Sequence, residues 1–180
     1  MDYKQIIERV ESFAIGYYER VSARPTIWET HVRLVRKYTR ELAEIENVDS
    51  RIIEIAAILH DIGRIEAGEG HYVRSHDLSK PFLETIDLSE EDRELILECI
   101  LKHSMSYASK DNSIEVRIIQ CADALANLFD EELQDYSRKT MSKDEINQAF
   151  LKLLNKITLD SARAIAEPRV QELKALLDKD

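Results

Sequence analysis

Apolar residues recur at three- and four-residue spacing along most of the chain, which is the period of an amphipathic helix. Residues ~51–62 depart from this pattern because nearly every side chain there is apolar, and such a helix lies at the centre of a fold. Capping signals at Ser89 and Ser142 mark two further helix starts. Helices are expected over residues ~3–22, ~27–46, ~51–62, ~90–103, ~113–130, ~143–157 and ~160–178.

The longest irregular stretch is residues 64–75, which contains Gly68 and Gly70 and is expected to be a substrate loop. Ser75 can cap a further helix that begins at His76. Pro81 falls inside that helix and either kinks or restarts it, and Pro168 interrupts the last helix.

The chain has 180 residues, 44% of them apolar and 33% charged, which fits one compact domain over residues 1–180. With only four glycines and three prolines, the expected fold class is all-α. No apolar run approaches the ~20 residues that span a bilayer, and the N-terminus lacks the pattern of a signal peptide. We therefore expect a cytoplasmic protein in which Cys99 and Cys121 are reduced core residues.

The net charge of −10 opposes binding to DNA or RNA. A small anionic substrate remains compatible with this charge if a metal ion and arginines make the field locally positive. The final third of the chain, residues ~143–178, carries no evident chemistry and is expected to serve packing or contacts in a homo-oligomer.

Candidate chemistry centres on His60-Asp61, which follows the central apolar helix and precedes Gly63. A buried His-Asp pair is costly unless it binds something, and imidazole with carboxylate suits a divalent metal. Asp123 likewise lies within an apolar stretch and needs a cation nearby. Six residues of metal-ligand type, from five segments, share such a setting: His31, His60, Asp61, His76, His103 and Asp123.

The order of these residues, with the string His60-Asp61-Ile62-Gly63 and the later Ala122-Asp123, resembles the HD domain of metal-dependent phosphohydrolases. The resemblance covers residues ~28–130, and Leu159 to Val170 is similar to the tail of small stand-alone HD hydrolases. It implies a helical bundle, with the C-terminal helices packed on the motif core. It also implies a metal bound by four residues: His31, His60, Asp61 and Asp123. In dinuclear members, residues at the positions of His76 and His103 bind a second metal that Asp61 bridges.

Differences between this chain and known members of the family limit the substrates that we expect. Members that cleave deoxynucleoside monophosphates or the guanosine alarmone carry an acidic residue where this chain has Arg64. Cyclic-dinucleotide members have a second consecutive His, where Ser104 follows His103 here. The triphosphohydrolase pattern of a His soon after the HD-x-Gly turn is also absent. The remaining similarity is to small HD hydrolases of undefined substrate.

The expected activity is hydrolysis of a nucleotide or another small phosphate ester or anhydride by metal-activated water. One or two ions of Mn, Fe, Co, Ni or Zn, with Mg as a further option, would serve as cofactor. Asp61 would orient the water, and Arg64 would bind a phosphate oxygen and stabilise transition-state charge. His76 and His103 would bind the second ion or donate a proton to the leaving oxygen. Lys102 is a further candidate for substrate binding, although a solvated helix lysine is the favoured interpretation.

Two alternatives remain open at this level. Some helical HD proteins bind two irons with four His and two Asp and cleave C–C or C–P bonds with dioxygen. Others use the fold as a non-catalytic sensory or binding module, which the intact ligand set disfavours. The specific substrate, the physiological metal and the oligomeric state are not readable from the sequence.

Overall fold

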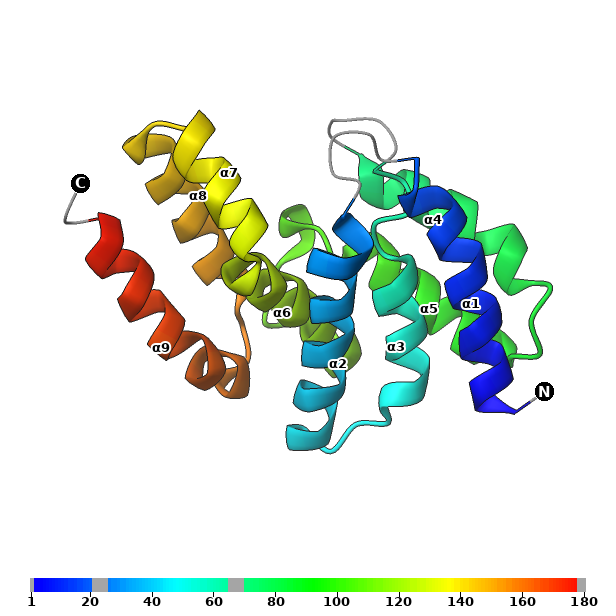
Figure 1. The fold of residues 1–180 in the computed structure, drawn as a ribbon. Coiled ribbons are helices and arrows are strands. Elements are labelled where there is room, and N and C mark those ends of the chain that lie inside the picture. The colour runs from blue at the N-terminus through cyan, green and yellow to red at the C-terminus, as the bar shows by residue number, and fades with distance from the viewer. Residues whose placement is uncertain (1, 21–25, 65–69, 178–180) are drawn as a thin grey trace.

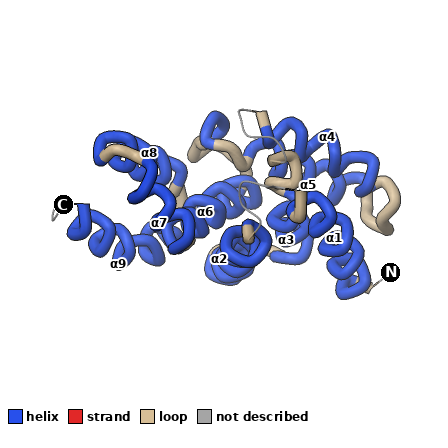
Figure 2. Tube along the Cα trace, turned by 45° about the horizontal axis from the view of Figure 1, so that its top comes forward, coloured by secondary structure: helices blue, strands red, loops and turns tan. Residues whose placement is uncertain are grey.

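The computed structural model describes residues 2–20, 26–64 and 70–177, and all regular structure in these ranges is helical (Figure 2). A π-helical turn spans Trp28–Val32, and a short 3-10 turn spans Met105–Tyr107. The α-helices are α1 (Tyr3–Tyr18), α2 (Arg33–Ile45), α3 (Ser50–Leu59), α4 (His71–Leu83), α5 (Glu90–Lys102), α6 (Ile114–Phe129), α7 (Glu131–Thr140), α8 (Lys143–Lys156) and α9 (Asp160–Leu177).

The centre of the molecule is formed by α2, α3 and α6, with α2 packed against both other helices. Seven of the ten residues of α3 and most of α6 are buried, as their apolar sequences predict. Helices α1, α4 and α5 cover one side of this centre, while α7, α8 and α9 form the opposite end of the molecule (Figure 1). The all-α expectation is therefore confirmed.

Side-chain caps begin several helices where the sequence predicts them. The hydroxyl of Ser89 accepts a hydrogen bond from the N–H of Asp92 at the start of α5, and Ser142 forms a capping box with Glu145 at the start of α8. Asp130 caps α7 in the same way, so α7 directly follows α6. The sequence analysis did not predict α7.

The start of α4 corrects one expectation. The helix begins at His71 rather than His76, because its N-cap residue Gly70 has φ +84, a left-handed conformation that favours glycine. Residues 71–75 of the expected substrate loop are thus helical, and residues 65–69 of that loop lie outside the described residues. Pro81 stands in the last turn of α4 without interrupting it, and α9 likewise continues through Pro168.

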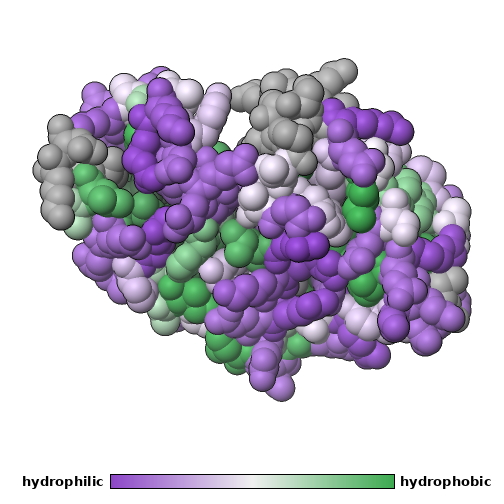
Figure 3. Space-filling model, viewed as in Figure 1, coloured by the Kyte–Doolittle hydropathy of each residue, from purple (hydrophilic) through white to green (hydrophobic). Residues whose placement is uncertain are grey.

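Both cysteines are buried and free, as expected. In the described parts of the chain, every helix is too short or too polar to cross a membrane. The face seen in Figure 3 is mostly hydrophilic, and its apolar atoms lie mainly in the seams between helices.

Candidate metal centre

A close approach between two segments builds the site. Beyond Leu59 the chain continues as a turn through Gly63, and the first turn of α4 packs directly on this turn. A Cβ atom on Gly63 would lie 2.5 Å from the carbonyl oxygen of His71 and 2.5 Å from the nitrogen of Ser75, so only glycine fits. The N–H of Gly63 donates to the Ser75 hydroxyl (2.9 Å), and Nε of Arg74 donates to the Gly63 carbonyl (3.0 Å). These contacts place the start of α4 beside Asp61.

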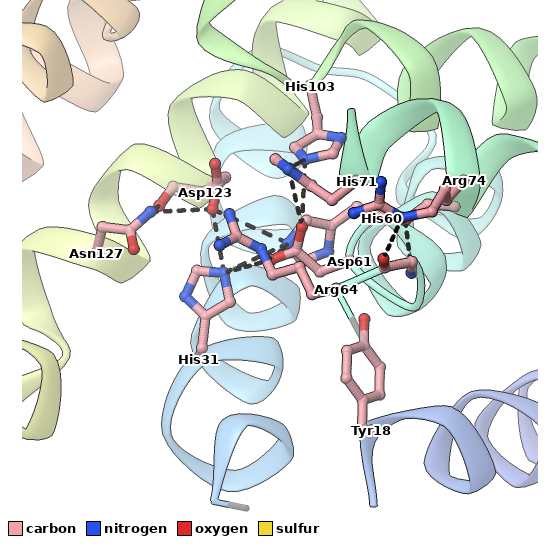
Figure 4. Close-up of polar contacts among 12 residues, drawn as sticks. Tyr18, His31, His60, Asp61, Arg64, His71, Arg74, His103, Asp123 and Asn127 are labelled. Carbon is pink, nitrogen blue, oxygen red and sulfur yellow. Dashed lines mark hydrogen bonds and ion pairs between the residues drawn. The ribbon is translucent and has the colours of Figure 1, made fainter. Parts of the chain in front are cut away.

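Three of the predicted ligands, His31, His60 and Asp123, meet on one side of a fourth, Asp61 (Figure 4). His31, in the π-helical turn, has its Nε2 3.4 Å from Nε2 of His60 and 3.1 Å from Oδ1 of Asp123. Oδ2 of Asp61 lies 3.5 Å from Nε2 of His60 and 3.7 Å from Nε2 of His31. All four side chains are buried. π-Helical turns recur at functional sites, where they re-aim a side chain.

The other oxygen of Asp61 faces a second pair of imidazoles. Oδ1 lies 3.4 Å from Nε2 of His71 and 3.4 Å from Nε2 of His103, and these two nitrogens are 3.2 Å apart. Asp61 therefore stands between two clusters of donors and directs one oxygen to each. We call these the first cluster (His31, His60, Asp61, Asp123) and the second cluster (Asp61, His71, His103).

The spacing of both clusters fits metal ions. Two ligands that are 2.0–2.1 Å from a tetrahedral ion lie about 3.4 Å apart, close to the separations in both clusters. Oδ1 of Asp61 is buried without a hydrogen-bond partner in the structure. Nδ1 of His60 donates to the Ala57 carbonyl (2.8 Å), and Nδ1 of His103 donates to the Ile100 carbonyl (2.6 Å). Since a carbonyl only accepts, each Nε2 keeps a lone pair for an ion.

Both carboxylates are held in the charged form. Burial alone would raise the pKa of Asp61, but Arg64 and His60 lower it well below its usual range. The Nε of Arg64 is 2.5 Å from Oδ2 of Asp61. Burial also opposes the charge of Asp123, and the buried ammonium of Lys156, in contact with its Oδ2, lowers that pKa well below its usual range.

The histidines of the two clusters differ. Burial lowers the pKa of His103 and lowers that of His71 to about 4, so both imidazoles are neutral near pH 7, as ligands must be. Burial also opposes a proton on His60, but Asp61 and Asp123 reverse this and raise its pKa.

Two candidates from the sequence do not join the clusters. Nδ1 of His76 lies 2.9 Å from Oδ1 of Asp77, and the side chain is partly exposed. Because α4 begins at His71, His76 lies five residues further on, about 140° around the helix from the residue that faces Asp61. Lys102 pairs with Glu98 (2.6 Å), as an exposed helix lysine does. The placement expected for His76 was therefore wrong, and His71 occupies it.

The sequence analysis missed the place of two residues, His71 and Lys156. The glycine at position 70 could have indicated that a helix starts at His71, because glycine is an accepted N-cap. The pairing of Lys156 with Asp123 joins residues far apart in the chain and has no local signal.

A cavity of about 620 Å³ opens from the clusters towards the C-terminal helices. Arg64, His71, His103, Asp123 and Lys156 line its inner end. Most of the rest of its wall comes from α7, α8 and α9, and Ser104, Met105, Asn127 and Met141 complete it. Its volume is in the range of small-molecule sites in proteins, which measure about 300–1,000 Å³.

Comparisons with known proteins agree with this architecture. The family model of the HD domain matches residues 28–128. A solved HD-superfamily hydrolase from Bacillus thuringiensis is 22% identical with a TM-score of 0.73, and the match covers 99% of this chain and 96% of that one. Bacillus subtilis YpgQ in complex with ADP is 20% identical with a TM-score of 0.70, covering 96% of this chain and 93% of YpgQ. A comparison with curated proteins finds no match.

Proposed function

The chain belongs to the HD domain family, and on that premise we propose that it is a metal-dependent phosphohydrolase acting on a nucleotide or a similar small phosphate ester or anhydride. The observation that carries the proposal is the position of Asp61, whose two carboxylate oxygens each face a pair of imidazole nitrogens at metal-ligand spacing. The solved complex of YpgQ with ADP supports a nucleotide as the phosphate compound.

In this proposal the first cluster holds one ion, and the second cluster holds another through His71 and His103. A bound divalent ion (Mn, Fe, Co, Ni, Zn or Mg) supplies hydroxide at neutral pH and offsets phosphate charge. Asp61 belongs to both clusters, so it would position the hydroxide relative to the phosphate. Arg64 and Lys156 already balance the charges of Asp61 and Asp123, so any ion makes the inner cavity positive. An anionic substrate can therefore enter an acidic protein.

Arg64 is the proposed phosphate-binding residue. Its side chain is 44% exposed and lines the cavity, while its Nε contacts Asp61. A guanidinium has five N–H donors, so contact with Asp61 leaves others for phosphate oxygens. The contact with Asp61 also raises the pKa of Arg64, which keeps it charged. The proton-donor role expected for His103 is not retained, because its Nδ1–H donates to the Ile100 carbonyl and its Nε2 carries a lone pair. Lys102 has no part in this proposal.

A dinuclear-iron oxygenase is the second candidate. One observation favours it: with His71 in place, four histidines and two aspartates stand within one group of contacts. Bound iron together with substrate-dependent oxygen uptake would identify this activity.

The test is a screen of metal-stripped protein, reloaded separately with each ion, against nucleotides and small phosphate esters. We expect release of phosphate or pyrophosphate that requires the ion and is lost in Asp61→Asn, with His76→Ala as the matched control. Oxygen uptake is followed in the same samples. Release that persists in Asp61→Asn, or its absence with every ion and compound, would overturn the proposed function.

A further inference from the structure

The cavity beside the clusters is walled by the part of the chain for which the sequence indicated no chemistry. Seven residues of helix α8 line it. Five of them are three or four residues apart and form one stripe along the helix: Lys143, Ile146, Phe150, Leu153 and Lys156. Ala149 and Lys152 lie beside that stripe. The stripe faces the cavity over the whole length of α8, although Ile146 and Leu153 are only partly buried by other protein atoms.

The stripe changes chemical character along its length. At its inner end the ammonium of Lys156 contacts Asp123 of the first cluster. At 1.5 Å per residue, Lys143 lies about 20 Å further along the helix axis. The side chains between them, Ile146, Phe150 and Leu153, are apolar. The inner end thus suits an anion, and the middle suits an uncharged group with a large apolar face.

Two amide side chains of α6 and α7 also line the cavity. Asn127 of α6 lines the cavity and donates to Oδ1 of Asp123 (3.1 Å). Gln134 of α7 also lines it and donates to the Asn127 carbonyl (2.8 Å). Met141, which follows α7, is also a lining residue. The wall is thus charged at the clusters, polar at Asn127 and Gln134, and apolar along the middle of α8. Three further basic residues, Arg138, Lys143 and Lys152, also line it.

We propose that this cavity binds a nucleoside phosphate with its phosphates at the metal clusters, its sugar beside Asn127 and Gln134, and its base against the apolar stripe of α8. The inference rests on the proposed function and deepens it, since it assigns substrate selection to the C-terminal helices. Inorganic polyphosphates and small sugar phosphates have no group that uses the apolar stripe. A nucleobase buries its faces there while its phosphates remain near cationic groups.

Two kinds of ligand with the same anionic head test the inner and the apolar parts of the cavity separately. Methylenediphosphonate has the head alone, and the α,β-methylene analogues of adenosine, guanosine, cytidine and thymidine diphosphate add sugar and base. Binding to the metal-loaded protein is measured by calorimetry. We expect at least one nucleoside analogue to bind about tenfold more tightly than methylenediphosphonate, the size of one base-stacking contact.

The variant Ala149→Trp adds bulk to the apolar part of the cavity from an exposed helix position, without removing a core side chain. It should weaken the nucleoside analogue about tenfold, by displacing the base, and leave methylenediphosphonate nearly unchanged. The matched control is Gln148→Trp, at the adjacent exposed position, which does not line the cavity. Circular dichroism and the melting temperature verify that both variants are folded.

Equal affinity of wild-type protein for methylenediphosphonate and every nucleoside analogue would overturn the inference, and so would equal effects of the two tryptophan variants. These outcomes are separate from the test of hydrolysis. Metal-dependent phosphate release from small esters without nucleoside preference would leave the hydrolase standing and reject the base site. Nucleoside binding without phosphate release would support the base site and reject the hydrolase activity.

Discussion

Glu54 and Asp61 are both almost fully buried carboxylates, one inside α3 and the other just past its end, yet their surroundings are opposite in kind. Glu54 accepts hydrogen bonds from the hydroxyl of Tyr3 (2.8 Å) and from Arg36 (2.7 Å) and Arg40 (2.8 Å). Asp61 has one contact with Arg64, but its Oδ1 faces imidazole nitrogens and lacks a hydrogen-bond partner in the structure.

The difference separates a structural charge from a functional one. Buried carboxylates are tolerated when donors satisfy them, as the N–H and O–H groups of α1 and α2 satisfy Glu54. His103 offers Oδ1 of Asp61 a lone pair rather than a donor, because its Nδ1 is engaged by the Ile100 carbonyl. A cation between the two groups would satisfy both. Glu54 thus ties three helices together, while Asp61 is arranged for ions.

The largest effect is expected for Asp61→Asn. Removing the shared carboxylate should abolish tight metal binding and lower turnover by about 10³-fold or more, since the ion supplies several kcal/mol of transition-state stabilisation. Metal content by mass spectrometry and phosphate release measure the two effects. Retention of both ions by a folded variant would show that Asp61 is structural, as Glu54 is.

Arg64→Ala should lower turnover by about 10²- to 10³-fold while the ions stay bound, because it removes a charge-assisted contact used in the transition state. Arg64→Lys should recover part of the loss, since an ammonium lacks the planar fork of donors. Steady-state kinetics with parallel metal analysis provides the measurement. A near-wild-type rate at full metal occupancy would contradict the phosphate-binding role.

Glu54→Gln tests the other carboxylate. We expect a loss of about 3 kcal/mol in the free energy of unfolding, at the low end for breaking a buried ion pair because Arg40 is 55% exposed. Metal content should not change. Chemical denaturation at pH 7 measures the stability difference, and a stability equal to that of the wild type would show that the cluster around Glu54 contributes nothing.

The same variant has a defined pH dependence. Burial opposes the charge of Glu54, but Arg40, Arg36 and Tyr3 lower its pKa below the ordinary value of 4.5. A lowered folded-state pKa contributes stability that is fully present above the unfolded-state pKa and is lost as pH falls through the folded value. The stability difference between wild type and Glu54→Gln should therefore be constant from pH 7 to about 5 and shrink below 4.5. A difference that grew with acid would contradict this assignment.

The smallest expected contrast is between two histidines of α4. His71→Ala should weaken the second ion by at least about 10- to 100-fold, the range found even for indirect partners of metal ligands. His76→Ala, five residues along the same helix, should change neither metal affinity nor turnover. Titration of metal-free protein with Mn²⁺ measures both. Equal effects of the two substitutions would place the second cluster elsewhere.

Features that depend on neighbouring residues in the chain were predictable from the sequence, whereas contacts between distant residues were not. The apolar pattern and Gly63 are local, and they predicted α3 and the turn after it. The convergence of His31, His60, Asp61 and Asp123 was implied by the resemblance to the HD domain. Their role as metal ligands stays a prediction. His71 was assigned to a loop because Ser75 is the more usual cap, whereas its hydroxyl is engaged by Gly63.

The stripe on α8 shows what the sequence could not predict. Its periodicity was readable, but the same spacing describes an ordinary packing face, and only the position of Lys156 beside Asp123 distinguishes the two. Contacts between residues so distant in sequence depend on the packing of α8 against α6, which no local pattern specifies.

The most direct test of the central claim is an anomalous-scattering map from crystals of the Mn²⁺-loaded protein. We expect one peak among His31, His60, Asp61 and Asp123, and a second among Asp61, His71 and His103, with Asp61 between them. A map without a peak at either cluster, or with ions bound only elsewhere, would contradict the assignment of Asp61 as the shared ligand.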